Sequence, residues 1–160
     1  MKTTLAAALA FAALTPAVPA LAGEQSILVE TAAMESWTES VQQTLDRRLI
    51  DSVWAARVEP VSGIVQLRFQ LDEQGRATDL EVYRSTGHRR TDTVAARAVR
   101  HLRNLDEVPV SNPHQRTFQA NIIFAQNPEE FAALEQELAR SEASRLALGN
   151  DEASVVVLGG

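Results

Sequence analysis

The chain has 160 residues, of which 45% are hydrophobic and 22% charged, a composition typical of one modest globular domain. The net charge is −6 and no long basic run is present, which argues against nucleic acid as a partner, because phosphates are bound by clustered Lys and Arg. The absence of cysteine excludes disulfides, thiolate metal sites and a cysteine nucleophile.

The N-terminal residues have the pattern of a secretory signal peptide. Lys2 is followed by an apolar run from Leu5 to Leu14, and Ala20-Leu21-Ala22 is a small-x-small cleavage pattern. We therefore predict that residues 1–22 are a cleaved signal peptide. The alternative is an uncleaved membrane anchor, since residues 5–22 make about 18 uncharged residues, close to the length that spans a bilayer.

A helix is predicted after a short flexible leader, residues 23–33. Ser36 and Glu39 have the spacing of a capping box, which places the start of the helix near Ser36. The helix should end near Trp54, before Pro60. An apolar residue recurs every fourth position and gives the helix one buried face: Trp37, Val41, Leu45, Leu49 and Val53.

Residues 62–88 predict a β-hairpin. Apolar and polar residues alternate over residues 65–71 and again over residues 78–83, the period of a half-buried strand. The four residues Asp72-Glu73-Gln74-Gly75 between the runs are polar, and Gly75 can adopt a positive φ.

The remaining elements follow in order. A helix with an apolar stripe starts near Thr91, which we predict as its N-cap, with Asp92 in the first turn. A third strand is predicted over residues 116–125, and an acidic helix over residues 127–149 that begins with Asn127-Pro128. Residues 150–160 are a tail with no assigned structure.

The predicted fold class is therefore α+β, with a three-stranded antiparallel sheet packed by helices on one face, in the order α-β-β-α-β, plus an extra C-terminal helix. The core domain spans residues 34–126.

Four segments, in their order and spacing, resemble the TonB/TolA C-terminal domain family. They are residues 63–69 (GIVQLRF), 72–76 (DEQGR), 80–88 (LEVYRSTGH) and 91–100 (TDTVAARAVR). The resemblance extends over about residues 36–124. It implies a periplasmic domain that binds short extended segments of envelope or outer-membrane proteins by adding a strand to its sheet.

By this resemblance the strand that receives the partner is the third one, with the partner-binding residues Thr117, Phe118, Gln119, Ala120, Asn121, Ile122, Ile123 and Phe124. The family also implies that two copies can exchange strands and form a homodimer. The acidic C-terminal helix is additional to the family pattern and could cover the same edge.

The sequence has no long spacer between the apolar N-terminus and the domain, so we expect a stand-alone periplasmic protein-binding module. The alternative is a membrane-anchored, TonB-type energy transducer of outer-membrane transport with an uncleaved N-terminal segment. An envelope enzyme is a third and weaker hypothesis.

No pattern predicts catalysis, a cofactor or a metal. His88, His101 and His114 fall on a turn, a helix end and a loop, and Asp72 with Glu73 reads as a solvated turn. The arginine-rich middle of the chain is expected to compensate the acidic C-terminal helix, with an acidic partner or an anionic lipid surface as the alternative; its arginines are Arg68, Arg84, Arg89, Arg90, Arg97, Arg100 and Arg103.

Overall fold

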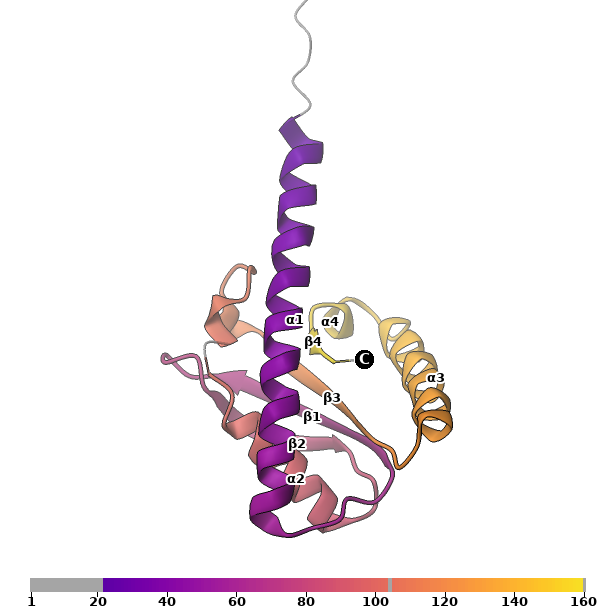
Figure 1. The fold of residues 1–160 in the computed structure, drawn as a ribbon. Helices are drawn as coiled ribbons and strands as arrows, with labels where there is room; N and C mark the ends of the chain where they lie inside the picture. The colour runs from indigo at the N-terminus through magenta and orange to yellow at the C-terminus, as the bar shows by residue number, and fades with distance from the viewer. Residues whose placement is uncertain (1–21, 104, 160) are drawn as a thin grey trace, which may run out of the picture.

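The computed structural model describes residues 22–103 and 105–159, with side chains described from residue 32 onward (Figure 1). Residues 1–21, which contain most of the predicted signal peptide, lie outside the described residues. The helices are α1 (Ala22–Ala56), α2 (Arg89–Arg100), α3 (Pro128–Leu146) and α4 (Asn150–Ala153). The strands are β1 (Gly63–Leu71), β2 (Ala77–Arg84), β3 (Phe118–Phe124) and β4 (Val156–Leu158), and two 3-10 turns, Leu105–Glu107 and Pro113–Gln115, lie between α2 and β3.

One mixed sheet connects the strands in the order β2-β1-β3-β4. The central strand β1 is antiparallel to β2 and to β3, with Leu67 opposite Val82 on one side and Ala120 on the other. The fourth strand is parallel to β3. The predicted α+β class and the order of its first five elements are thus confirmed, and the chain adds a fourth strand.

Helices α1 and α2 pack on one face of the sheet and form the apolar core with it (Figure 1). The rings of Phe69 on β1 and Phe118 on β3 are stacked with centroids 5.6 Å apart. The helices contribute Trp37, Val41 and Leu45 from the predicted stripe of α1 and small alanines from α2, which allow close approach to the sheet.

Helices α3 and α4 contact the opposite face. Gln66 and Arg68 alternate along β1 with the core residues Val65, Leu67 and Phe69, so they point away from α1 and α2. Their side chains bind α3 and α4. The sheet is therefore covered on both faces, by an apolar layer on one and a largely polar layer on the other.

Two predicted helix starts are wrong. Helix α1 begins at Ala22, so residues 23–33, expected to be a leader, are helical and Ser36 lies inside the helix. Between Gly23 and Pro60 no glycine or proline interrupts the sequence, so nothing local stops the helix from extending past the capping-box pattern.

The N-cap of α2 is His88, three residues before the predicted N-cap Thr91, because Thr91 and Asp92 make other contacts. Thr91 Oγ1 accepts a hydrogen bond from Val61 N (3.0 Å). The Asp92 carboxylate accepts hydrogen bonds from the hydroxyls of Ser85 (2.5 Å) and Thr86 (3.0 Å) and thereby ties the end of β2 to α2.

Candidate partner-binding site

The predicted partner-binding strand lies in the interior of the sheet over part of its length. Phe118, Ala120 and Ile122 are buried on the α1 face, and Gln119 and Asn121 are buried on the α3 face. The side chains of Ile123 and Phe124 are half-buried, and Thr117 directly precedes the strand. Most side chains of this strand are thus buried within the protein, so a partner could bind it only through the backbone groups of its edge.

Strand β4 occupies the first half of that edge. Val156, Val157 and Leu158 pair with Phe118, Gln119 and Ala120 in parallel, and Val156 N donates to Thr117 O (3.0 Å). The run of three valines near the end of the sequence favours a strand. So short a run does not indicate which strand of the sheet it pairs with. The edge is therefore covered by a strand and not by the acidic helix.

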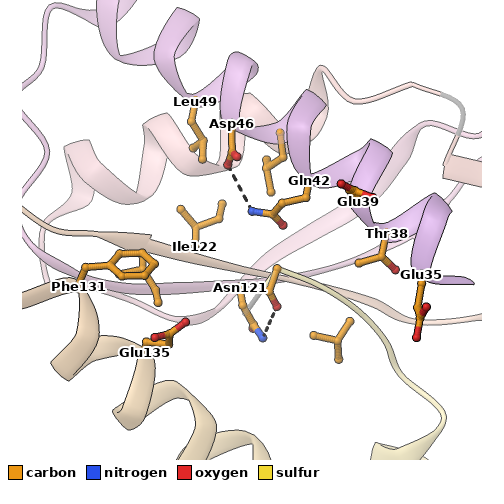
Figure 2. A pocket seen from close by; sticks show the side chains of 14 residues that line it. Glu35, Thr38, Glu39, Gln42, Asp46, Leu49, Asn121, Ile122, Phe131 and Glu135 are labelled. Carbon is orange, nitrogen blue, oxygen red and sulfur yellow. Dashed lines mark hydrogen bonds between the residues drawn. The ribbon is translucent and has the colours of Figure 1, made fainter. Parts of the chain in front are cut away.

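The second half of the β3 edge opens into a groove. The described pairing of β4 ends at Leu158, which leaves Asn121 to Phe124 beyond it, with Gly159 close to the Asn121 carbonyl. A groove of about 670 Å³ borders this stretch, with walls from α1, β3, α3 and β4 (Figure 2).

Polar and acidic side chains make up about half of the groove lining, and apolar side chains make up most of the rest. Glu35, Glu39 and Asp46 come from α1, and Glu135 comes from α3. Phe131 of α3 contributes an aromatic ring that is 45% exposed. Figure 2 shows Glu135 and Phe131 on the side of the groove that faces α1, so both walls present side chains to the same space.

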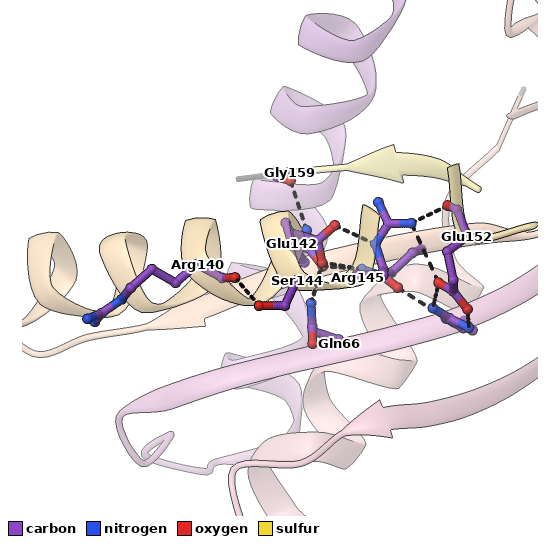
Figure 3. Close-up of polar contacts among 10 residues, drawn as sticks. Gln66, Arg140, Glu142, Ser144, Arg145, Glu152 and Gly159 are labelled. Atoms are coloured by element: carbon purple, nitrogen blue, oxygen red, sulfur yellow. Dashed lines mark hydrogen bonds and ion pairs between the residues drawn. The ribbon is translucent and has the colours of Figure 1, made fainter. Parts of the chain in front are cut away.

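A buried polar cluster fixes α3 against the sheet (Figure 3). Glu142 Oε1 accepts hydrogen bonds from Gln66 Nε2 and Gln119 Nε2, both at 2.8 Å. The same two amides donate to Asn121 Oδ1 at 3.0 Å. Arg145 Nε donates to Glu142 Oε2 at 2.7 Å. Buried polar groups are tolerated when they are paired in this way, so the cluster sets the position of α3.

The cluster continues into α4 and so places β4. Arg68 donates to both carboxylate oxygens of Glu152, at 3.1 and 2.5 Å, and Arg145 donates to the Glu152 carbonyl. The hydrogen bond from Arg68 lowers the pKa of Glu152, and Glu152 in turn raises the pKa of Arg68. A bidentate pair of this kind specifies geometry, and here it holds α4 at Glu152, four residues before the first residue of β4.

Residues 54–125 match the protein-family model described as Gram-negative bacterial TonB protein C-terminal. Residues 54–125 are a TonB C-terminal domain. Comparisons with curated proteins and with solved structures gave no match.

The TonB C-terminal domain of this chain runs from the end of α1 to the residue after β3. Most of α1 and all of α3, α4 and β4 lie outside the matched residues. TonB C-terminal domains are periplasmic parts of non-catalytic transport machinery that interacts with outer-membrane receptors. The groove beside β3 is thus framed by the domain on one side and by additional elements on the other.

The other sequence candidates do not converge on a site. His88 and His101 flank opposite ends of α2, and His114 lies in the 3-10 turn Pro113–Gln115. Residues 22–103 and 105–159 hold no cluster of metal-ligating side chains. Asp72 accepts hydrogen bonds from Arg76 and from the Gln74 amide, which lower its pKa and close the hairpin turn of the TonB C-terminal domain. No helix among the described residues is both long and apolar enough to cross a bilayer.

Proposed function

We propose that the chain is a periplasmic protein-binding module that binds an extended segment of an outer-membrane protein by adding it as a strand to β3. The observation that carries this proposal is the open second half of the β3 edge, Asn121 to Phe124, which faces a groove. An exposed strand edge is a template for another chain, because its N–H and C=O groups are ready to pair.

The alternation of the strand indicates which groups would pair. Thr117 O accepts from β4, so the backbone groups of Gln119, Asn121 and Ile123 face the same side by the two-residue period. Ile123 lies beyond the described end of β4 pairing, so its N–H and C=O are the groups we assign to a partner. Each such hydrogen bond adds about 0.5–1.5 kcal/mol, and the groove walls supply contacts for side chains.

The opposite edge of the sheet is a poorer template. The pairing of β2 with β1 has register shifts near Leu67 and between Arg68 and Gln70, and Asp79 of β2 has a φ of 49°. Bulges of this kind twist an edge away from further pairing. This supports β3 as the receiving strand.

Photo-crosslinking tests the proposal. Phe131, in the groove wall, is replaced by p-benzoylphenylalanine, and the folded protein is irradiated with detergent-solubilised outer membranes. We expect an adduct to an outer-membrane protein that disappears with Ile123→Pro, which removes the N–H assigned to the partner. Ile123→Ala keeps that N–H and should reduce the adduct far less.

The matched control carries the same photoreactive residue at Trp54, which is 78% exposed and lies away from the groove. Circular dichroism establishes that the Ile123→Pro variant is folded. An adduct of equal yield from position 54, or one that survives in folded Ile123→Pro, would contradict strand addition at β3.

A second candidate is a membrane-anchored energy transducer of the TonB type, and the length of α1 favours it. Among the described residues the helix has 35 residues, Ala22–Ala56, and Ala22 is also the last residue of the predicted apolar segment (Figure 1). At 1.5 Å per residue it is about 52 Å long. An uncleaved anchor would therefore be joined to the domain by a continuous helix.

A further inference from the structure

We propose that the segment bound in the groove between α1 and α3 is cationic, with Lys or Arg alternating with apolar residues. This inference rests on the proposed function, because it concerns the same open edge of β3. It goes further by assigning the chemical class of the partner segment.

The charge of the groove is the first argument. The described side chains that line it include the carboxylates of Glu35, Glu39, Asp46 and Glu135, and none of them is basic. Three of the carboxylates come from α1 and one comes from α3, so a strand laid on Asn121 to Phe124 would have carboxylates on both sides. Complementary charge favours a cationic strand there and disfavours an acidic one.

The second argument is that three acids of the C-terminal region outside the groove are already paired with arginines of the chain. Glu137, Glu142 and Glu152 are paired with arginines of β2, α3 and β1 respectively. Within the described residues, the ion pairs include none with Glu35, Glu39 or Glu135. The acids facing the sheet are neutralised by the chain itself, whereas those facing the groove are left for a partner.

The third argument concerns hydrogen-bond donors. Gln42 Oε1 is buried and has no hydrogen-bond partner among the described residues, while Gln42 Nε2 donates to Asp46 (3.3 Å; Figure 2). Gln42 lines the groove beside Gly159, at the end of β4. A buried acceptor is normally satisfied, so a ligand rich in N–H donors suits this position. Lys and Arg carry donors and no acceptors on their side chains.

The apolar groups define the rest of the pattern. Phe131, Leu49 and Ile123 also line the groove. Successive residues of an extended strand point to opposite sides, so cationic and apolar residues would alternate. The open stretch of β3 has four residues, which corresponds to about 13 Å of strand.

Fluorescence anisotropy of three labelled eight-residue peptides tests the inference: alternating Lys-Val, Thr-Val and Glu-Val. We expect the Lys-Val peptide to bind at least tenfold more tightly than the Thr-Val peptide, and the Glu-Val peptide most weakly. The ratio of the Lys-Val affinity to the Thr-Val affinity should fall as the salt concentration rises from about 50 to about 500 mM. Over this range the Debye length falls from well above to below about 8 Å, so charge interactions are increasingly screened.

Charge reversal in the groove supplies the variant. Glu39→Lys with Glu135→Lys should weaken Lys-Val binding by tenfold or more and strengthen Glu-Val binding. The matched control is Glu73→Lys with Glu107→Lys, which changes net charge equally at exposed positions outside the groove. It should change either affinity less than twofold.

The outcomes separate the two proposals. Equal binding of the three peptides, or equal effects of the groove and control variants, would overturn the cationic inference. If the three peptides bound equally but Ile123→Pro abolished their binding, the strand-addition proposal would stand and only the cationic inference would fail. A Lys-Val preference that depends on Glu39 and Glu135 but survives Ile123→Pro would support the cationic groove and overturn strand addition.

Discussion

At the scale of single residues, Arg68 and Glu152 show how one ion pair connects distant parts of the chain. Arg68 lies in the middle of the sheet, and Glu152 lies 84 residues later in α4. The side chains are 15% and 24% exposed, so the pair is shielded from solvent more than an ordinary surface pair. Arg68 also stacks over the ring of Tyr83, 3.7 Å from its centroid, which fixes the guanidinium from the other side.

We expect the stabilising effect of Glu152 to be lost in acid. Arg68 lowers the pKa of Glu152 in the folded protein, so the carboxylate stabilises the fold above its unfolded pKa, near 4.3. That stabilisation is lost as pH falls through the lowered pKa. Glu152→Gln should therefore lower the urea midpoint at pH 7 and differ little from the parent near pH 3.

Glu135→Gln is the control, because Glu135 has no ion pair within the described residues. This substitution should leave the urea midpoint almost unchanged at either pH. A Glu152→Gln destabilisation that is as large at pH 3 as at pH 7 would show that the carboxylate charge is not what holds α4.

Other residues show what local sequence can predict. Gly75 has a φ of 66°, as the hairpin turn requires, and a side chain there would collide with Asp106. The hydroxyls of Ser85 and Thr86 accept hydrogen bonds from the amides of Gly87 and His88, as their position in the turn suggests. These roles depend on neighbours in sequence. The contact of Gly75 with Asp106 does not, and no pattern predicts it.

At the scale of elements, β4 is the unexpected feature. It has three residues, is parallel to β3 and ends in Leu158, which is buried in the main core. So short a strand would be unstable by itself, because its few hydrogen bonds do not offset the loss of conformational entropy. Its position depends on the polar cluster that anchors α3 and α4, and on Asn121 Nδ2, which donates to Gly159 O (3.4 Å).

Removal of residues 154–160 should have two opposite effects. It exposes the β3 edge at Phe118 to Ala120, so a strand-forming peptide should bind more tightly. It also removes the burial of Leu158, which contributes about 1.5–3 kcal/mol to the free energy of unfolding. Urea denaturation and peptide anisotropy measure the two effects.

Leu158→Ala is the matched variant, because it loses the buried side chain while retaining the backbone of β4. It should lower stability without a comparable gain in peptide affinity. Unchanged affinity after truncation of a protein that remains folded would show that β4 does not limit access to β3.

At the scale of the whole molecule, the additional C-terminal elements neutralise part of the charge of the domain. Arg84 pairs with Glu137 of α3, and Arg68 pairs with Glu152 of α4. These contacts agree with the interpretation of the arginine-rich segment as compensation for the acidic helix. Four carboxylates line the groove, on the side where α1 and α3 face each other, and the ion pairs of the described residues include none of them.

The processing of the N-terminus distinguishes the soluble module from the anchored transducer. We expect the protein isolated from a periplasmic extract to begin at Gly23, with the mass of residues 23–160. Helix α1 begins at Ala22, so cleavage at that point would leave the helix that packs on the domain intact. Intact mass spectrometry makes the measurement, with the membrane fraction as the comparison. A full-length chain confined to that fraction would favour the anchored transducer.

The sequence by itself determined the features that depend on local pattern. The alternation in β1 and β2, the apolar stripes of α1 and α2, and the start of α3 at Asn127-Pro128 follow from residues close together in the chain. The family pattern in residues 63–100 lies in the same region, which is why the TonB C-terminal domain could be recognised without a structure.

Only the tertiary structure decided which part of the β3 edge is free. The pairing of Phe118 to Ala120 with β4 joins segments 38 residues apart, and the contacts that hold β4 join residues up to 84 apart. No local propensity encodes such contacts, because their free energy depends on burial and pairing in the assembled fold. The same long-range packing brings the acids of α1 and α3 to one groove and leaves Asn121 to Phe124 beside it.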